Sequence, residues 1–292
     1  MEKLSRTILL FLIISVGIYD AFAQGPWSQG KNSGFIQLQT TIPFGPYDAL
    51  IQDGESVMEV ETNLNREVFS ANFDIYASYG LTDKLTAFTK LPLKYVSTGN
   101  RTDSMHFSNV LDEGSLSGLG NYHLGLKYSL IDKQVKVAAS VQSNWNTTAR
   151  DLSRGLTTGY LSNAFGIYGH VGGSISERWY SYLDIGYNLS TNNYSDFTTA
   201  LFEVGYTASK KRNLIIALTI NSRQSVENGS FENASLDQTG LYTNDQEWVA
   251  YGLKVNYETK QGIGFNLSTY GLVSGNQLGL VGASSIGIYK KW

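Results

Sequence analysis

The stretch YHLGLKYSL, residues 122–130, alternates between apolar and polar side chains. Successive side chains of a β-strand point to opposite faces, so this period of two predicts a strand with one apolar and one wet face. The apolar face carries Tyr122, Leu124, Leu126, Tyr128 and Leu130, and the wet face carries His123, Gly125, Lys127 and Ser129. Such a strand either covers the core of a soluble sheet or separates lipid from a wet interior.

The same alternation recurs along the whole chain, and no long stretch keeps the 3.6-residue period of an amphipathic helix. Twelve segments share it, at 33–42, 67–80, 84–96, 119–131, 134–146, 160–175, 178–191, 197–208, 212–223, 246–258, 261–273 and 277–290. A soluble strand averages about 5 to 6 residues, whereas a tilted bilayer crossing needs about 9 to 11. The segment lengths therefore favour a membrane barrel.

The connections between these segments alternate in length. Short ones follow the second, fourth, sixth, eighth and tenth segments: LTDK, IDKQ, SERW, ASKKRN and TKQG. Long polar ones span 45–65, 99–117, 146–159 and 224–246, and only those around Asn192 and Asn276 are short on that side. Short periplasmic turns opposite long outer loops are typical of outer-membrane barrels. An even number of strands then puts both termini in the periplasm.

A soluble β-sandwich is the alternative fold, because its strands alternate too. Charged residues make up only 16% of the 292 residues, against about 25% in soluble domains. The proposed outer face carries Phe73, Ile75, Leu91, Leu93, Leu183, Ile185, Phe202, Val204, Leu253 and Val255, and the strand ends carry Tyr79, Tyr95, Trp145, Trp179, Tyr206 and Tyr257. An apolar band between aromatic girdles suits a bilayer. We predict an all-β, antiparallel up-and-down transmembrane β-barrel of twelve strands.

The N-terminus has the features of an export signal. Lys3 and Arg6 precede an apolar run at 8–18, and Ala21 and Ala23 form an A-x-A cleavage site. We expect residues 1–23 to be removed and residues 24–292 to form the barrel domain. The chain has no cysteine, which excludes a disulfide framework and a lipid-accepting Cys. These features predict the outer membrane of a Gram-negative bacterium, with outer-membrane lipid as a partner.

Two stretches carry a resemblance to a known family. YGLTDKLTAFTKLPL from Tyr79 and GLGNYHLGLKYSL from Gly118 resemble barrel proteins linked to the meta-pathway of phenol degradation, relatives of outer-membrane transporters for hydrophobic compounds. Asn121 stands where that family usually has Asp. The resemblance implies an outer-membrane barrel and transport of a hydrophobic compound. The closing stretch SSIGIYKKW, which ends on Trp292, resembles the signal read by the barrel assembly machinery.

Strand parity predicts which ionisable residues line the lumen. They are Asp74, Lys90, Lys94, His123, Lys127, Lys136, His170, Asp184, Glu203, Lys254 and Glu258. Their mixed signs argue against a filter of one charge. Two functions remain open: a passive porin-like channel for a small, hydrophobic or aromatic solute, and a structural or surface-interaction barrel with a packed, non-conducting lumen. Pro92 removes one ladder donor and marks a possible break in the wall.

Enzyme chemistry is not expected. A phospholipase needs a Ser beside a His at the outer rim, but His106 and Ser108 fall in a loop, and His170 and Ser174 point inward near the periplasmic end. A protease site could draw only on Asp103, His106, Asp112 and Glu113 in one solvated loop. No metal-ligand spacing, phosphate loop or dinucleotide fingerprint occurs, so no cofactor is expected. The net charge of −3 argues against nucleic acid.

Overall fold

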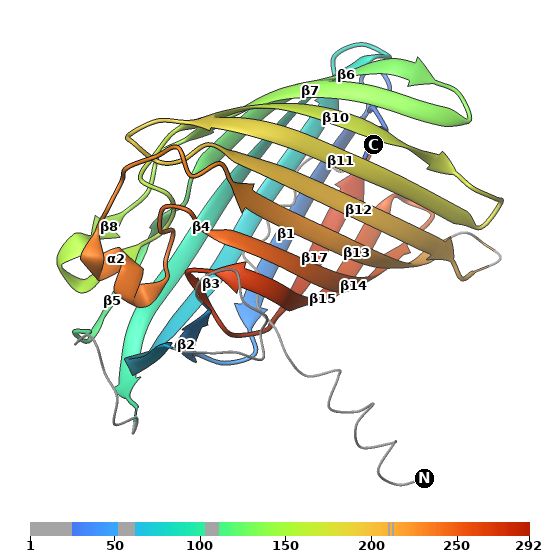
Figure 1. Ribbon diagram of the computed structural model, residues 1–292. Helices are drawn as coiled ribbons and strands as arrows, with labels where there is room; N and C mark the ends of the chain where they lie inside the picture. The colour runs from blue at the N-terminus through green and yellow to red at the C-terminus, as the bar shows by residue number, and fades with distance from the viewer. Residues whose placement is uncertain (1–24, 52–61, 103–110, 210, 212) are drawn as a thin grey trace, which may run out of the picture.

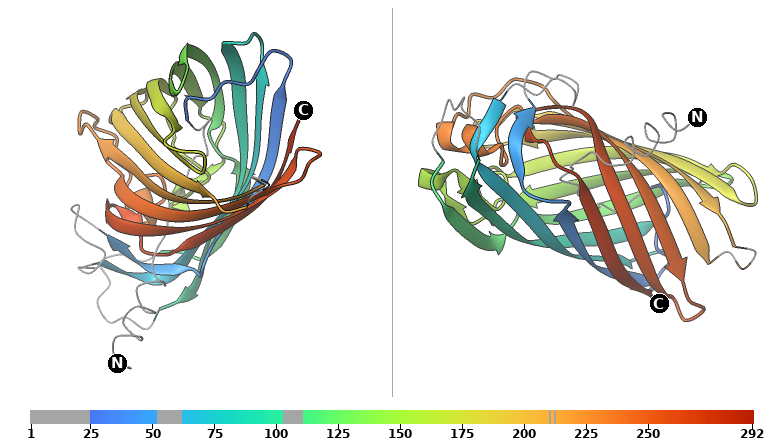
Figure 2. Two further views of the ribbon diagram at one scale, coloured as in Figure 1. Left: turned by 90° about the vertical axis from the view of Figure 1, so that its right-hand side faces the viewer. Right: turned by 90° about the horizontal axis from the view of Figure 1, so that it is seen from below.

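The computed structural model describes residues 25–51, 62–102, 111–209, 211 and 213–292. Within them, twelve antiparallel strands close into a barrel (Figures 1 and 2), each paired with the next along the chain and the last with the first. The strands are β1 (Gly34–Pro43), β3 (Thr62–Gly80), β4 (Leu85–Arg101), β6 (Tyr122–Asp132), β7 (Val135–Trp145), β10 (Ala164–Ser174), β11 (Trp179–Ser190), β12 (Phe197–Thr207), β13 (Leu214–Ser225), β14 (Glu247–Glu258), β15 (Ile263–Asn276) and β17 (Ala283–Lys291). The predicted all-β barrel is confirmed.

Each predicted segment overlaps one barrel strand, and two begin four or more residues later than predicted. The sixth strand starts at Ala164 instead of residue 160, because the preceding residues bind Asn121: its side chain accepts from the Tyr160 N–H at 2.8 Å. The last strand starts at Ala283 instead of residue 277, because β16 (Leu278–Gly279) leaves the wall and pairs with β2 (Tyr47–Ile51). Both differences lie at the long-loop end.

The two ends of the barrel differ as the connection lengths predict. Turns at 81–84, 133–134, 175–178, 208–213 and 259–262 form one end. The barrel seam also ends there, where the Gly34 N–H donates to the Trp292 carbonyl at 3.0 Å. The other end carries β2 and β16, together with β5 (Gly114–Leu119), β8 (Arg150–Asp151), η1 (Leu152–Arg154), β9 (Leu156–Thr157) and α2 (Ala234–Thr239).

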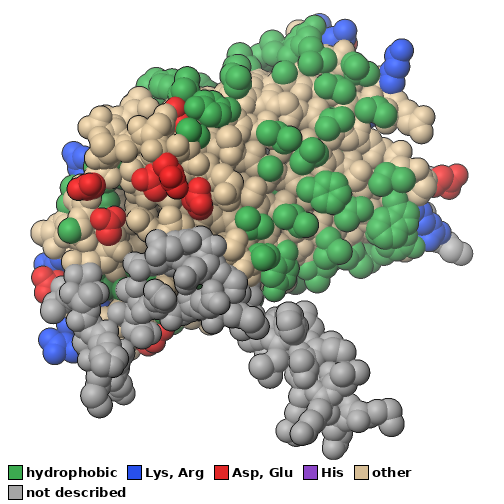
Figure 3. All heavy atoms as spheres, in the orientation of Figure 1, with side chains coloured by type: hydrophobic (Ala, Val, Ile, Leu, Met, Phe, Trp, Pro, Cys, Tyr) green, Lys and Arg blue, Asp and Glu red, His purple; other side chains and the backbone are tan. Residues whose placement is uncertain are grey.

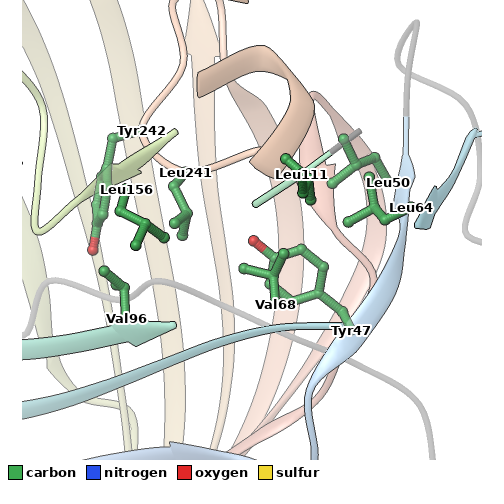
Figure 4. Packing of buried hydrophobic residues seen from close by; sticks show 9 residues of the cluster. All are labelled: Tyr47, Leu50, Leu64, Val68, Val96, Leu111, Leu156, Leu241 and Tyr242. Carbon is green, nitrogen blue, oxygen red and sulfur yellow. The ribbon is translucent and has the colours of Figure 1, made fainter. Parts of the chain in front are cut away.

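The long loops form a packed cap, which their polar composition did not predict. Loop residues Leu156, Leu241 and Tyr242 pack near Val68 and Val96 on the inner face of β3 and β4 (Figure 4). The same buried cluster includes Tyr47, Leu50, Leu64 and Leu111. The Tyr47 hydroxyl donates to the Thr239 carbonyl at 2.6 Å. The cap therefore covers the mouth of the barrel from the inside.

The outward face of the barrel is the apolar one. Leu126 is 43% exposed, whereas the adjacent Lys127 is 3% exposed. Figure 3 shows hydrophobic side chains gathered over the strands, with acidic side chains at the long-loop end. A soluble fold has the opposite arrangement, with polar side chains outside and apolar side chains inside. A closed barrel with an apolar exterior is the form that β-proteins take in the bacterial outer membrane. No helix among the described residues is long and apolar enough to span a membrane.

The outward face predicts where charge is least tolerated. Ile185 lies midway along β11 and is 54% exposed, so Ile185→Arg should destabilise the folded barrel by about 2–4 kcal/mol, as should Leu126→Arg in β6. Heat resistance on a semi-native gel and urea unfolding in lipid vesicles measure this loss. Lys133→Arg in a short turn is the control. If Ile185→Arg and Leu126→Arg were both as heat-resistant as the wild type, the assignment of these two side chains to the outward face would be wrong.

Candidate functional site

The lumen collects polar side chains from every part of the wall. Eight of the ionisable residues predicted to line it are buried: Asp74, Lys90, Lys94, His123, Lys127, His170, Asp184 and Glu203. The side chain of Lys254 is 17% exposed. Lys136 lies at the short-turn rim, where it pairs with Asp132. Glu258 also lies toward that rim and accepts from Lys291 and from the Tyr289 hydroxyl.

Opposite charges meet inside the barrel. Lys90 Nζ lies 3.6 Å from Asp74 Oδ2, across the β3–β4 pair. Lys254 donates to Glu203 Oε2, and the Tyr180 hydroxyl donates to Glu203 Oε1 at 2.7 Å. Removing one partner of such a pair leaves an uncompensated buried charge. Asp74 and Glu203 are thus each paired with a lysine inside the lumen.

A hydrogen-bonded chain crosses β7, β10 and β11 at mid-height. His170 lies directly opposite Asp184 in the β10–β11 ladder, and its Nδ1 is 2.8 Å from Asp184 Oδ1. Its Nε2 is 2.8 Å from Ser140 Oγ. The sequence analysis considered only Ser174 beside His170 and set that arrangement aside. Strand parity in β7 could have found Ser140, which shares the inward face with Ala138 and Gln142. The order of groups is that of a serine hydrolase triad.

The segment before β1 lies inside the lumen, which the sequence analysis did not anticipate (Figure 2). The Gly25 N–H donates to Asp184 Oδ2 at 2.9 Å, and Lys127 Nζ donates to the Gly25 carbonyl at 3.1 Å. Gly25 has a φ of 73°, and a Cβ there would lie 2.4 Å from the Trp27 ring. Residue 25 is therefore suited only to glycine. The predicted signal peptide and Gln24 lie outside the described residues.

Trp27 and Gln29 make further contacts between this segment and the barrel wall, toward the short-turn end. The Trp27 ring meets Tyr180 and Tyr182 edge-to-face, with centroids 5.8 and 5.5 Å apart. The Gln29 N–H donates to Thr86 Oγ1 at 2.9 Å. We call residues 25–33 the inner segment. It is anchored to the wall by polar contacts at both ends and by aromatic contacts between them.

Two cavities lie on either side of the inner segment. The one toward the cap, here named the cap-side cavity, has a volume of about 100 Å³ and is lined by His170, Asp184, Arg223 and Tyr242 among others. The one toward the short turns has a volume of about 420 Å³, and Trp27 and Lys127 are among its lining residues. Gly25 binds Asp184 on one side and Lys127 on the other, so the segment lies between the two cavities.

The wall at Pro92 has an interrupted ladder. β4 pairs with β6 over residues 85–90 and with β5 over residues 93–98, so Leu91 and Pro92 have no ladder partner on that side. The Gly120 N–H donates to the Pro92 carbonyl at 2.8 Å and spans the interruption. On the other side, Pro92 lies opposite Asp74 in β3. Its side chain lines the cap-side cavity.

Three further lumen residues were missed from the sequence. Arg223 shares the inward parity of Ala217, Thr219 and Asn221 in β13, so alternation could have found it. Tyr242 comes from a loop that folds back over the mouth, where no strand period marks it. Tyr160 falls within the predicted segment 160–175 but lies in the loop ahead of β10.

The anchor at Asp184 predicts how tightly the inner segment is held. The chain has no cysteine, so Ser28→Cys gives a single thiol in that segment. Losing a hydrogen bond to a charged acceptor costs about 1.5–3 kcal/mol, so Asp184→Ala should raise the maleimide labelling rate of this thiol by about tenfold or more. Asp132→Ala, at the exposed rim, is the control and should leave the rate unchanged. Equal rates in all three backgrounds would contradict the anchor.

Comparison with known proteins is informative at the level of fold. No family model and no curated protein matches the chain. The outer membrane channel COG4313 from Pseudomonas putida F1 superposes with a TM-score of 0.68 at 14% identity, covering 94% of this chain and 100% of that one. The NanC porin superposes with a TM-score of 0.52 at 8% identity, covering 87% and 98%. The outer-membrane barrel fold implied by the resemblance is confirmed.

Proposed function

We propose that the chain is a passive outer-membrane channel for a small, hydrophobic or aromatic solute. The observation that carries the proposal is the pair of cavities on either side of the inner segment, because a lumen interrupted by one short segment differs from a lumen packed throughout. The fold is shared with proteins described as a channel and a porin, which supports the same role. Passage would require the inner segment and the cap to move aside.

The packed-lumen barrel with a structural or surface-interaction role is the competing reading. The buried ion pairs and the cap favour it, since both rigidify the interior. The two readings differ in whether the inner segment can be displaced. Steps of ionic current in a planar bilayer, or swelling of liposomes in a solute, support the channel. Absence of both from correctly folded protein supports the structural barrel.

A serine esterase is a second candidate, favoured only by the chain from Ser140 through His170 to Asp184. Such a chain lets the imidazole take the hydroxyl proton while the carboxylate orients the ring. Here, however, the second oxygen of Asp184 holds Gly25, which gives the chain an anchoring role as well. Hydrolysis of a short-chain fluorogenic ester by purified protein, abolished in Ser140→Ala, would establish the esterase.

The remaining expectations about biogenesis and gating belong to the proposal as well. Residues 1–23 would be removed on export, and the strand ending at Trp292 would be read by the barrel assembly machinery. Trp292 is 57% exposed beside the β1–β17 seam, which leaves its ring accessible to a partner. A lateral opening at Pro92 stays a prediction, supported by the interrupted ladder.

The position of Trp27 predicts a change in conductance. Trp27→Ala removes the aromatic contacts with Tyr180 and Tyr182 and should raise the frequency and size of current steps in a planar bilayer. Trp145→Ala, on the outer face of β7, removes a ring of the same size without touching the lumen. It should conduct like the wild type. A Trp27→Ala barrel that is folded and no more conductive than the wild type would argue against the inner segment as the constriction.

A further inference from the structure

The cap-side cavity has an aromatic wall beneath the cap. Tyr160 and Tyr242 from the loops meet edge-to-face, with centroids 5.2 Å apart. Phe197, Phe88 and Trp248 from the strands line the same space. Aromatic rings in such arrangements present both faces and edges to a planar ligand. The volume of about 100 Å³ is below the ~150 Å³ of a cavity that holds a benzene ring, so this cavity has room for no more than a single ring.

Arg223 brings a positive charge to this wall. Its guanidinium carbon lies 3.5 Å from the centre of the Phe197 ring and 4.4 Å from that of Tyr160. Its Nε is buried and has no hydrogen-bond partner. No carboxylate among the described residues forms an ion pair with Arg223, in contrast to the paired charges deeper in the lumen. A guanidinium with an unused donor, held between rings, suits the planar end of a carboxylate.

A second donor and a second cation line the same cavity. Gln142 is buried, and its Nε2 has no hydrogen-bond partner. Lys94 Nζ lies 4.5 Å from the centre of the Tyr242 ring. Buried donors without partners are costly, and a ligand that offers only acceptors would relieve that cost. The cavity therefore combines aromatic faces, positive charge and unused donors, and the carboxylate in its lining, Asp184, is already engaged by Gly25 and His170.

We propose that the cap-side cavity binds a single-ring aromatic carboxylate, with the carboxylate on Arg223 and the ring against Tyr160 and Phe197. The inference deepens the proposed function by naming the class of solute, and its transport half rests on that function. A neutral aromatic would leave the charge of Arg223 uncompensated, and a small aliphatic anion would leave the aromatic wall unfilled. Both should bind less well than the aromatic acid.

Isothermal titration of the purified full-length barrel in detergent tests this, with benzoate as the probe. Benzamide supplies the ring without the charge, and acetate supplies the charge without the ring. We expect benzoate to bind at least about tenfold more tightly than either, and Arg223→Gln to weaken benzoate by about the same factor. Arg178→Gln, in an exposed short turn, is the matched control and should bind benzoate like the wild type.

Several outcomes would overturn the inference: no benzoate binding, equal binding of benzoate and benzamide, or unchanged benzoate affinity in folded Arg223→Gln. If Arg223→Gln does not give a heat-resistant barrel, the preference of the wild type among the three probes decides. Bilayer currents from the same preparations separate the two claims. A conducting barrel that ignores benzoate refutes this site alone, whereas a silent barrel that binds benzoate supports the site and refutes passive conduction.

Discussion

The structure depends on one constraint: a strand in lipid must have every backbone N–H and C=O paired within the protein. The pairing of β1 with β17 meets it by joining the first and last strands and removing both sheet edges. Once the wall is closed, strand parity fixes the environment of each side chain. Leu126 and Ile185 face outward, and Lys127 and Asp184 face inward, because they are neighbours along a pleated strand.

Closure of the barrel also encloses charged side chains in its interior. Charged side chains in a narrow lumen are largely removed from water, and each needs a partner. Asp74 is paired with Lys90, and Glu203 with Lys254. At mid-height, the inner segment provides a partner for both Asp184 and Lys127. The Gly25 N–H donates to Asp184, and the Gly25 carbonyl accepts from Lys127. Polar groups of the barrel wall thus hold the inner segment in the lumen that it blocks.

The sequence predicted the structure best in the segments where apolar and polar residues alternate with a regular period. Alternation predicted every barrel strand, and residues that it assigned to the inward face, such as Lys90 and Glu203, are buried. It could not predict the cap, because Leu156, Leu241 and Tyr242 are scattered in polar loops and become a core only when those loops meet. Nor could it place Gly25 or Trp27, which lie before the first strand and contact residues far along the chain. The contact of His170 with Ser140 was missed because Ser140 lies on β7, the neighbouring strand.

The central claim is that the inner segment occupies the lumen of the barrel in the membrane. A disulfide cross-link tests it directly, because the chain has no native cysteine. The Gln29 N–H lies 2.9 Å from Thr86 Oγ1, so cysteines at these two positions should form a disulfide in outer membranes of intact cells without added oxidant. Gln29→Cys paired with Leu126→Cys, which faces lipid, should not. Failure of the first pair to cross-link in a correctly folded barrel would contradict the account.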